Sequence, residues 1–270
     1  MVGKQKLTVL AEALSDRDLA LLRFLGFSRF ATTRQLARFA RHRHISWQSA
    51  LRQTSRAMNA LTGLKLTTKF QRRVGGKRAG STGIVWVLTP MGRRLIDAAG
   101  AEAPARRHRP ETEPSTTFLK HTLAITETHL TLKELDSAGQ IELLGFEREP
   151  ACWRRYLAST GATSVLKPDA FIIIGLSNFE DRYFLEIDCD SEALAVIVRK
   201  AIQYQTYQRS NTEQKTHGVF PAVLWITPTE RRATKINQRL AHEEDIIPGL
   251  FSAISFEHFA DSVLAGPIPP

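Results

Sequence analysis

The segment between residues 101 and 114 divides this 270-residue chain into two halves of opposite charge. It reads AEAPARRHRPETEP, is rich in proline, alanine and charged residues, and has no apolar periodicity, which is typical of an interdomain linker. Residues 1–114 contain 22 Lys and Arg against 7 Asp and Glu, a net charge of +15, whereas residues 115–270 contain 15 against 20, a net charge of −5. The sequence therefore predicts two domains, at residues 1–100 and 115–270, joined by a linker.

The basic first half is typical of a domain that binds a polyanion, because clustered Lys and Arg attract phosphates and release their counterions. The alternative is that these charges only keep the surface soluble. No stretch approaches the ~20 apolar residues that cross a bilayer, and residues 1–10 do not resemble a secretory signal. The two cysteines, Cys152 and Cys189, lack metal-ligand spacing. We therefore expect a cytoplasmic protein with no membrane partner.

The first half predicts three helices followed by a β-hairpin. Serine or threonine caps precede the apolar runs, and apolar residues on the third helix recur at alternating spacings of four and three. A basic, glycine-rich segment separates two strand-like runs, and a helix with proline at its first position follows. The predicted elements are helices after Ser15, at 34–41 and after Ser46, strands at 66–74 and 84–88, and a helix from Pro90.

Three helices followed by a hairpin form the winged helix-turn-helix arrangement, in which the third helix enters the major groove of DNA and the hairpin contacts the backbone. The polar face of the third helix and the cations of the hairpin are therefore the predicted DNA contacts. For each residue alone, a solvated surface position is the alternative. The candidates are Gln48, Ser49, Arg52, Gln53 and Arg56 on the helix and Lys69, Arg72, Arg73, Lys77 and Arg78 on the hairpin.

The second half predicts a mixed sheet with the element order α-β-β-β-α-β and further elements at its end. Its strand–helix–strand segment at 182–227 implies a right-handed crossover between parallel strands. The predicted elements are a helix at 115–137, strands at 140–149, 168–175 and 182–188, a helix at 192–209, a strand at 219–227, a helix at 229–243 and a short strand at 251–256.

Acidic residues lie at the ends of two neighbouring predicted strands. Asp169 opens one strand and Glu186 lies near the end of the next, so antiparallel pairing brings the two side chains to one end of the sheet. Asp188 points to the same face as Glu186 and is a further candidate catalytic residue. Facing carboxylates repel unless a cation lies between them, so we expect Mg²⁺ or Mn²⁺ held by Asp169 and Glu186, where it would polarise a scissile phosphate. A structural role is the alternative for Asp169 alone.

The next predicted helix carries Glu192, Lys200 and Tyr204 at multiples of four residues, and hence on one face. Lys200 is a candidate for stabilising the negative charge that develops on a phosphate. Tyr204 is a candidate for packing, for binding a phosphate or for acting as a nucleophile. His121 and Glu127 on the preceding helix could join such a site, with structural roles as the alternative.

These residues resemble the PD-(D/E)xK nuclease signature, and the arrangement over residues of about 15–227 resembles the replication-relaxation family, which includes MobC-type relaxases of mobilisable plasmids. The resemblance implies a restriction-endonuclease-like second domain, in which Asp169 and Glu186 hold the metal, and nicking at an origin of transfer or replication. The wider nuclease pattern has a lysine where this chain has Asp188, so either Lys200 replaces it or the centre is altered. The matching residues are His121, Pro168-Asp169, Glu186-Ile187-Asp188, Glu192, Lys200 and Tyr204.

Two functions of different classes remain. The first is a metal-dependent, strand-nicking DNA endonuclease, a relaxase that acts at an origin of transfer or replication of a plasmid or conjugative element. The second is a catalytically silent DNA-binding replication initiator or regulator with a nuclease-like scaffold, and a transposition-associated or defence nuclease is a weaker third. The joint presence of Asp169, Glu186 and Lys200 favours the first. The expected partners are double-stranded DNA and a conjugation coupling or accessory protein, and a homodimer is compatible with this function.

Overall fold

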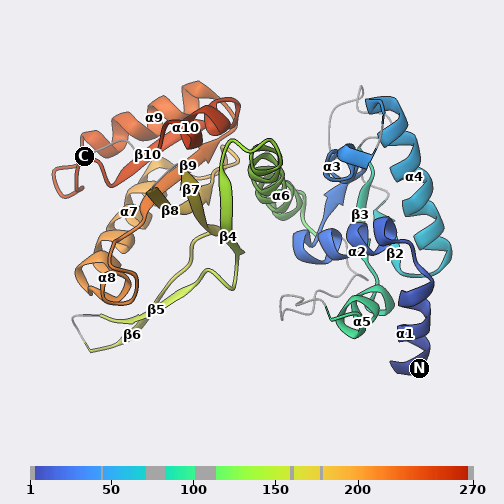
Figure 1. The fold of residues 1–270 in the computed structure, drawn as a ribbon. Coiled ribbons are helices and arrows are strands. Elements are labelled where there is room, and N and C mark those ends of the chain that lie inside the picture. Colours follow the sequence, from blue (N-terminus) through green and yellow to red (C-terminus); the bar gives the residue numbers. More distant parts are fainter. Residues whose placement is uncertain are drawn as a thin grey trace. The chain divides into compact units, whose positions relative to one another are not determined.

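The computed structural model describes residues 4–43, 45–70, 83–100, 114–158, 161–176 and 179–266. The chain divides into two compact units, Met1–Leu130 and Thr131–Pro270, and each is considered by itself (Figure 1). The predicted linker lies, except for Pro114, outside the described residues. The division between the units falls inside helix α6 (Thr116–Ser137), so the first part of this helix belongs to the first unit.

The first unit combines helices with a small antiparallel sheet of order β1-β3-β2. Each of the elements predicted from the sequence has a counterpart here. The short strand β1 was outside the prediction because it has two residues and its partner, Trp86, is distant in sequence. The elements are α1 (Lys4–Ala13), α2 (Asp16–Ser28), β1 (Ala31–Thr32), α3 (Thr33–Phe39), the 3-10 turn η1 (Arg41–Arg43), α4 (Trp47–Gly63), β2 (Thr67–Phe70), β3 (Val85–Leu88) and α5 (Pro90–Ala98).

Side-chain caps explain where these helices begin. The hydroxyl groups of Ser15, Thr32, Ser46 and Thr89 each accept a hydrogen bond from a backbone N–H in the first turn of α2, α3, α4 and α5. Such bonds satisfy N–H groups that have no partner within the helix. At α3 the cap is reciprocal, because Gln35 also accepts from the Thr32 N–H at 3.0 Å. The predicted caps are therefore confirmed.

The N-terminal part of α6 is fastened to the first unit by apolar and polar contacts. Leu119 and Leu123 belong to one apolar cluster with Phe30. The Gln35 amide donates a hydrogen bond to the Leu123 carbonyl at 2.9 Å and another to Glu127 at 2.9 Å, and Glu127 also forms an ion pair with Arg38. These contacts explain why residues up to Leu130 belong to the first unit.

The second unit is built on a five-stranded mixed sheet of order β10-β9-β8-β7-β4. Strands β4, β7 and β8 are antiparallel neighbours, whereas β8, β9 and β10 are parallel. The order α6-β4-β7-β8-α7-β9 contains the predicted α-β-β-β-α-β series. The elements are β4 (Glu142–Arg148), β5 (Arg154–Leu157), β6 (Thr163–Leu166), β7 (Ala170–Leu176), β8 (Phe179–Ile187), α7 (Leu194–Arg209), α8 (Thr212–His217), β9 (Ala222–Thr227), α9 (Glu230–Ala241), β10 (Phe251–Ser255), the 3-10 turn η3 (Phe256–His258) and α10 (Phe259–Ala265).

Two features of the second unit position its candidate site. One is an aromatic core, in which Phe184 of β8 and Trp225 of β9 belong to the same buried cluster as Ile197 and Tyr204 of α7. The other is the β5–β6 hairpin, a separate two-stranded sheet inserted between β4 and β7, which Figure 1 shows as its own ribbon. The hairpin was outside the sequence prediction, whereas α7 begins within two residues of its predicted start at 192.

The packing of α5 in the first unit gives a stability prediction. A Cβ atom at Gly92 would overlap the backbone carbonyl of Leu66, which is not a flexible group. We therefore expect Gly92→Ala to lower the free energy of unfolding by about 1–3 kcal/mol. Urea denaturation of the full chain, with hydrogen exchange to locate the loss in residues 4–100, measures this effect.

Gly63→Ala is the matched control, because an added Cβ there has no neighbour within 4 Å. Its helical position predicts no loss of stability, since Ala has a higher helix propensity than Gly. Equal stability of the Gly92→Ala and Gly63→Ala proteins would contradict the packing of α5 against Leu66.

Candidate active site

The central strand of the second unit, β8, ends beside Asp169, the residue that precedes the neighbouring strand β7. Antiparallel pairing of Ala170 with Leu185 places Asp169, just before β7, at the same end of the sheet as Glu186. The Asp169 N–H donates to the Leu185 carbonyl at 3.1 Å, and its Oδ2 accepts from the Ile187 N–H at 2.7 Å. The Asp169 carboxylate is therefore held at the C-terminal end of β8, the end of the strand at which Glu186 also lies.

Two residues of α7 converge on Glu186. The Lys200 ammonium lies 2.9 Å from Glu186 Oε2, and the Tyr204 hydroxyl donates to Glu186 Oε1 at 2.6 Å. Lys200 also lies 3.0 Å from Glu192, which precedes α7. Because Lys200 and Tyr204 are one helical turn apart, one face of α7 supplies both contacts. The structure thus brings together Asp169, Glu186, Lys200 and Tyr204 of the predicted site.

Burial and neighbouring charge determine how this cluster binds protons. Glu186 is 2% exposed, and its burial, together with the charge of Asp169, raises the pKa of Glu186 to about 7 despite the opposing effects of Lys200 and Tyr204. Burial alone would lower the pKa of Lys200, but the charges of Glu186, Asp169 and Glu192 outweigh it and raise that pKa. Lys200 is therefore a cation at neutral pH, and the pKa of Glu186 lies above that of an ordinary glutamate.

The structure places Asp188 in a different set of contacts. Its carboxylate forms an ion pair with Arg232 of α9 and accepts a hydrogen bond from the Asp190 N–H at 2.9 Å. Arg232 also donates to the Glu192 carbonyl at 2.6 Å. Arg232 could not be predicted from the sequence, because no local pattern links α9 to the end of β8. Asp188 therefore forms an ion pair with an arginine of α9. In the wider nuclease pattern, a lysine occupies the position of Asp188 itself.

Two carboxylates at the end of β8 are the residues that could hold a hard cation. Asp169 and Glu186 are the neighbouring carboxylates, and the effect of Asp169 on the Glu186 pKa shows negative charge that a cation would neutralise. Within the residues that the structure describes, no group of three or more His, Cys, Asp or Glu side chains is arranged to hold a metal. Mg²⁺ commonly binds through one or two carboxylates, with water and substrate phosphates as its other ligands. A metal at Glu186 would share the carboxylate with Lys200 and Tyr204, since each contacts one of its two oxygens and a carboxylate has about four acceptor sites.

The predicted DNA-binding residues of the first unit lie on an exposed face of α4. Gln48, Arg52 and Arg56 are exposed at intervals of four, and Ser49 and Gln53 beside them are partly exposed. The helix contains no Asp or Glu, so its surface charge is positive. Lys69 at the end of β2 is exposed as well. The remaining predicted contacts, Arg72, Arg73, Lys77 and Arg78, lie outside the described residues.

Glu127, on α6, makes contacts within the first unit. Glu127 is occupied in the first unit by Gln35 and Arg38, which is the structural alternative that the sequence left open. His121 lies on the same helix and is partly buried.

A family model described as replication-relaxation matches residues 22–223, which is more than half of the chain, and the chain belongs to this family. Membership indicates an interaction with DNA and a role in plasmid replication or mobilisation. Neither the comparison with curated proteins nor the comparison with solved structures gave a match. No helix in the described ranges has both the length and the apolar character needed to span a membrane.

The contact between Lys200 and Glu186 gives a prediction about proton binding. Because the Lys200 cation lowers the pKa of Glu186, we expect Lys200→Met to raise that pKa above about 7. The measurement is a pH titration of the glutamate carboxyl carbons by NMR, with Glu186→Gln to assign the signal. Lys235→Met, on an exposed position of α9, should leave the titration unchanged. A Glu186 pKa that is equal or lower in Lys200→Met would refute the predicted effect.

Proposed function

We propose that this protein is a metal-dependent, DNA-nicking endonuclease of the relaxase type, acting at an origin of transfer or replication. Its first unit would be a winged-helix DNA-binding domain and its second a restriction-endonuclease-like domain. The observation that carries the proposal is the convergence of Asp169, Glu186 and Lys200 at one end of the central strand β8. The β4-β7-β8-α7-β9 arrangement around this point supports it, because it contains the mixed β-β-β-α-β series predicted for this half of the chain.

In this proposal the residues have separate tasks. Asp169 and Glu186 would hold Mg²⁺ or Mn²⁺, which when bound polarises the scissile phosphate and lowers the pKa of water. Lys200 remains charged beside Glu186, and its side chain is 30% exposed, so it can reach a bound phosphate and stabilise the charge that develops there. The position of Lys200 on α7 supports the view that it replaces the lysine that this chain lacks at position 188.

The burial of the tyrosines favours water over a tyrosine nucleophile. Tyr204 is 1% exposed and its hydroxyl donates to Glu186. Burial and the Glu186 charge raise the pKa of Tyr204 well above its ordinary value, so its phenolate is not readily formed. Tyr183 and Tyr207 are also buried, and the ring of the partly exposed Tyr156 packs at a tilted angle against that of Tyr207. Tyr204 would therefore position Glu186 rather than attack DNA.

The first unit would position the DNA. Helices α2, α3 and α4 are followed by β2 and β3, which pair with each other, and β3 also pairs with β1. This is the order of elements in a winged helix. The exposed face of α4, with Arg52 and Arg56 and without acidic residues, supports its assignment as the helix that enters the major groove.

A specific observation also favours the second function, a silent DNA-binding initiator or regulator. Both oxygens of the Glu186 carboxylate are already engaged, by Lys200 and Tyr204, and Asp188 is paired with Arg232. Such a closed cluster could stabilise the fold without catalysis. The nicking experiment separates the two functions.

A supercoiled plasmid with its cognate origin should be converted to open circles when the protein and Mn²⁺ or Mg²⁺ are present. Glu186→Gln should abolish this conversion because it removes a metal ligand, and Lys200→Met should slow it by about 10²–10³-fold because a stabilising cation is removed. The nicked strand should carry no attached protein after denaturation.

Glu244→Gln, an exposed carboxylate in the loop after α9, is the control and should nick as the wild type does. Undiminished nicking by Glu186→Gln would remove the assigned site. Specific DNA binding without any nicking by the wild-type protein would favour the silent initiator or regulator.

The proposed role of α4 predicts the salt dependence of DNA binding. Replacing Arg52 and Arg56 by Ala should weaken binding to all duplexes and lower the slope of log K against log salt by about 0.9 for each phosphate that the variant no longer neutralises. Fluorescence anisotropy at several salt concentrations measures the slope. Replacement of Arg231 and Lys235, two exposed cations of α9, should leave it unchanged. An unaltered slope in the α4 variant would argue against phosphate binding by this helix.

A further inference from the structure

The β5–β6 hairpin has two chemically different faces. Its strands are antiparallel, with Arg155 opposite Val165 and Leu157 opposite Thr163. Because side chains alternate along a strand, these four residues share one face, here called the outer face, and Arg154 lies on the other, inner face. The two faces therefore need separate explanations.

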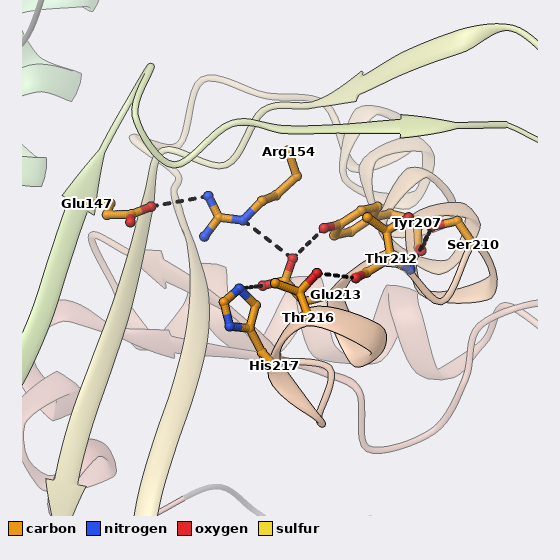
Figure 2. Close-up of polar contacts among 8 residues, drawn as sticks. All are labelled: Glu147, Arg154, Tyr207, Ser210, Thr212, Glu213, Thr216 and His217. Atoms are coloured by element: carbon orange, nitrogen blue, oxygen red, sulfur yellow. Dashed lines mark hydrogen bonds and ion pairs between the residues drawn. The ribbon is translucent and has the colours of Figure 1, made fainter.

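The inner face is fastened to the rest of the unit by Arg154 and by Tyr156 and Leu166, which pack with the buried cluster around Phe184. Arg154 lies 3.2 Å from Glu147 of β4 and 3.4 Å from Glu213 of α8, and its guanidinium lies 4.6 Å from the centre of the Phe171 ring. Figure 2 shows Arg154 between these two carboxylates, with Tyr207 donating to the buried Glu213 from the other side. A lone two-stranded hairpin is marginally stable in water. These contacts hold the ribbon in a defined position.

The outer face combines exposed apolar side chains with cations. Leu157 is 66% exposed and Val165 is 37% exposed. Arg155 on this face and Lys167 just after β6 are exposed as well, and among the described residues no carboxylate pairs with either cation. Apart from the paired Arg154, residues 151–168 contain two cations, Arg155 and Lys167, and no Asp or Glu, in a half of the chain whose net charge is −5. This local charge is complementary to a polyanion.

The base of the hairpin lies beside the candidate active site. Lys167 precedes Asp169 by two residues, and the buried Cys152 thiol, just before β5, donates to the Pro168 carbonyl at 3.1 Å. Burial and then the charge of Asp169 raise the pKa of Cys152, so the thiol lies within electrostatic reach of that carboxylate. A DNA strand at Asp169 would therefore lie close to the start and end of the hairpin.

We propose that the outer face of the hairpin binds an unpaired segment of the DNA strand next to the scissile phosphate. Arg155 and Lys167 would contact phosphates, while Leu157 and Val165 would pack on base faces. Cations beside exposed apolar side chains match the alternation of phosphates and bases in single-stranded DNA, and apolar side chains placed between bases favour an unstacked strand. This inference rests on the proposed function, because it takes DNA as the substrate.

The experiment compares two duplexes of the same length, one fully paired and one with an internal thymine bubble. Binding of the full-length Glu186→Gln protein is measured by fluorescence anisotropy in EDTA, so that no strand is cut. This protein should prefer the bubble, and Leu157→Ser with Val165→Ser should reduce the preference by about fivefold. Arg155→Ala with Lys167→Ala should weaken binding to the bubble and affect the paired duplex less.

Exposed residues away from the hairpin provide the controls. Val219→Ser, at a position that is 53% exposed, is matched to Leu157→Ser, and Arg231→Ala with Lys235→Ala is matched to the hairpin cations. Leu157→Thr, which keeps a residue suited to a strand, should also reduce the preference if Leu157→Ser proves unstable.

An unchanged preference for the bubble in every hairpin variant would overturn this inference, whether or not the wild-type protein nicks DNA. Another outcome would distinguish the hairpin proposal from the proposed nuclease function. If the wild type does not nick but the hairpin variants lose the preference, the nuclease proposal fails and the hairpin proposal stands.

Discussion

The carboxyl group of Glu186 is buried on the central strand of a sheet, and the side chains around it compensate for the cost of that burial. A buried carboxylate is strongly destabilising unless it is paired, hydrogen-bonded or protonated. Lys200 and Tyr204 meet this requirement from one face of α7, which fixes the rotation of the helix over β8. Asp169 acts in the opposite direction by adding negative charge. The negative charge of Glu186 can thus be neutralised by Lys200, by a proton or by another cation.

The remaining acidic residues near β8 are divided between two basic side chains. Lys200 joins Glu186 to Glu192, whereas Arg232 of α9 contacts Asp188 and the Glu192 carbonyl. The segment between β8 and α7 is therefore held from two sides. Through Glu192, Arg232 influences the geometry around Lys200 from a separate helix.

Local signals predicted much of this architecture, and long-range contacts account for what they missed. Helix caps such as Ser46, and the four-residue spacing of Lys200 and Tyr204, depend on neighbouring residues and can be read from sequence. The meeting of Asp169 and Glu186 follows from two strands joined by a short turn. The partner of Asp188 could not be predicted, because Arg232 is 44 positions away. Nor does residue type reveal that Tyr204 is buried, since that depends on how α7 packs on the sheet.

The position of the unit boundary inside helix α6 limits where the gene could be recombined or the protein divided into fragments. The division between the units lies at Leu130, within the helix, and Leu119 and Leu123 complete the apolar cluster around Phe30. A cassette exchanged at residues 101–114 would separate those leucines from their cluster and leave apolar surface in water on both fragments. A viable crossover, or a stable expressed fragment of the N-terminal half, would have to keep the chain intact through Leu130.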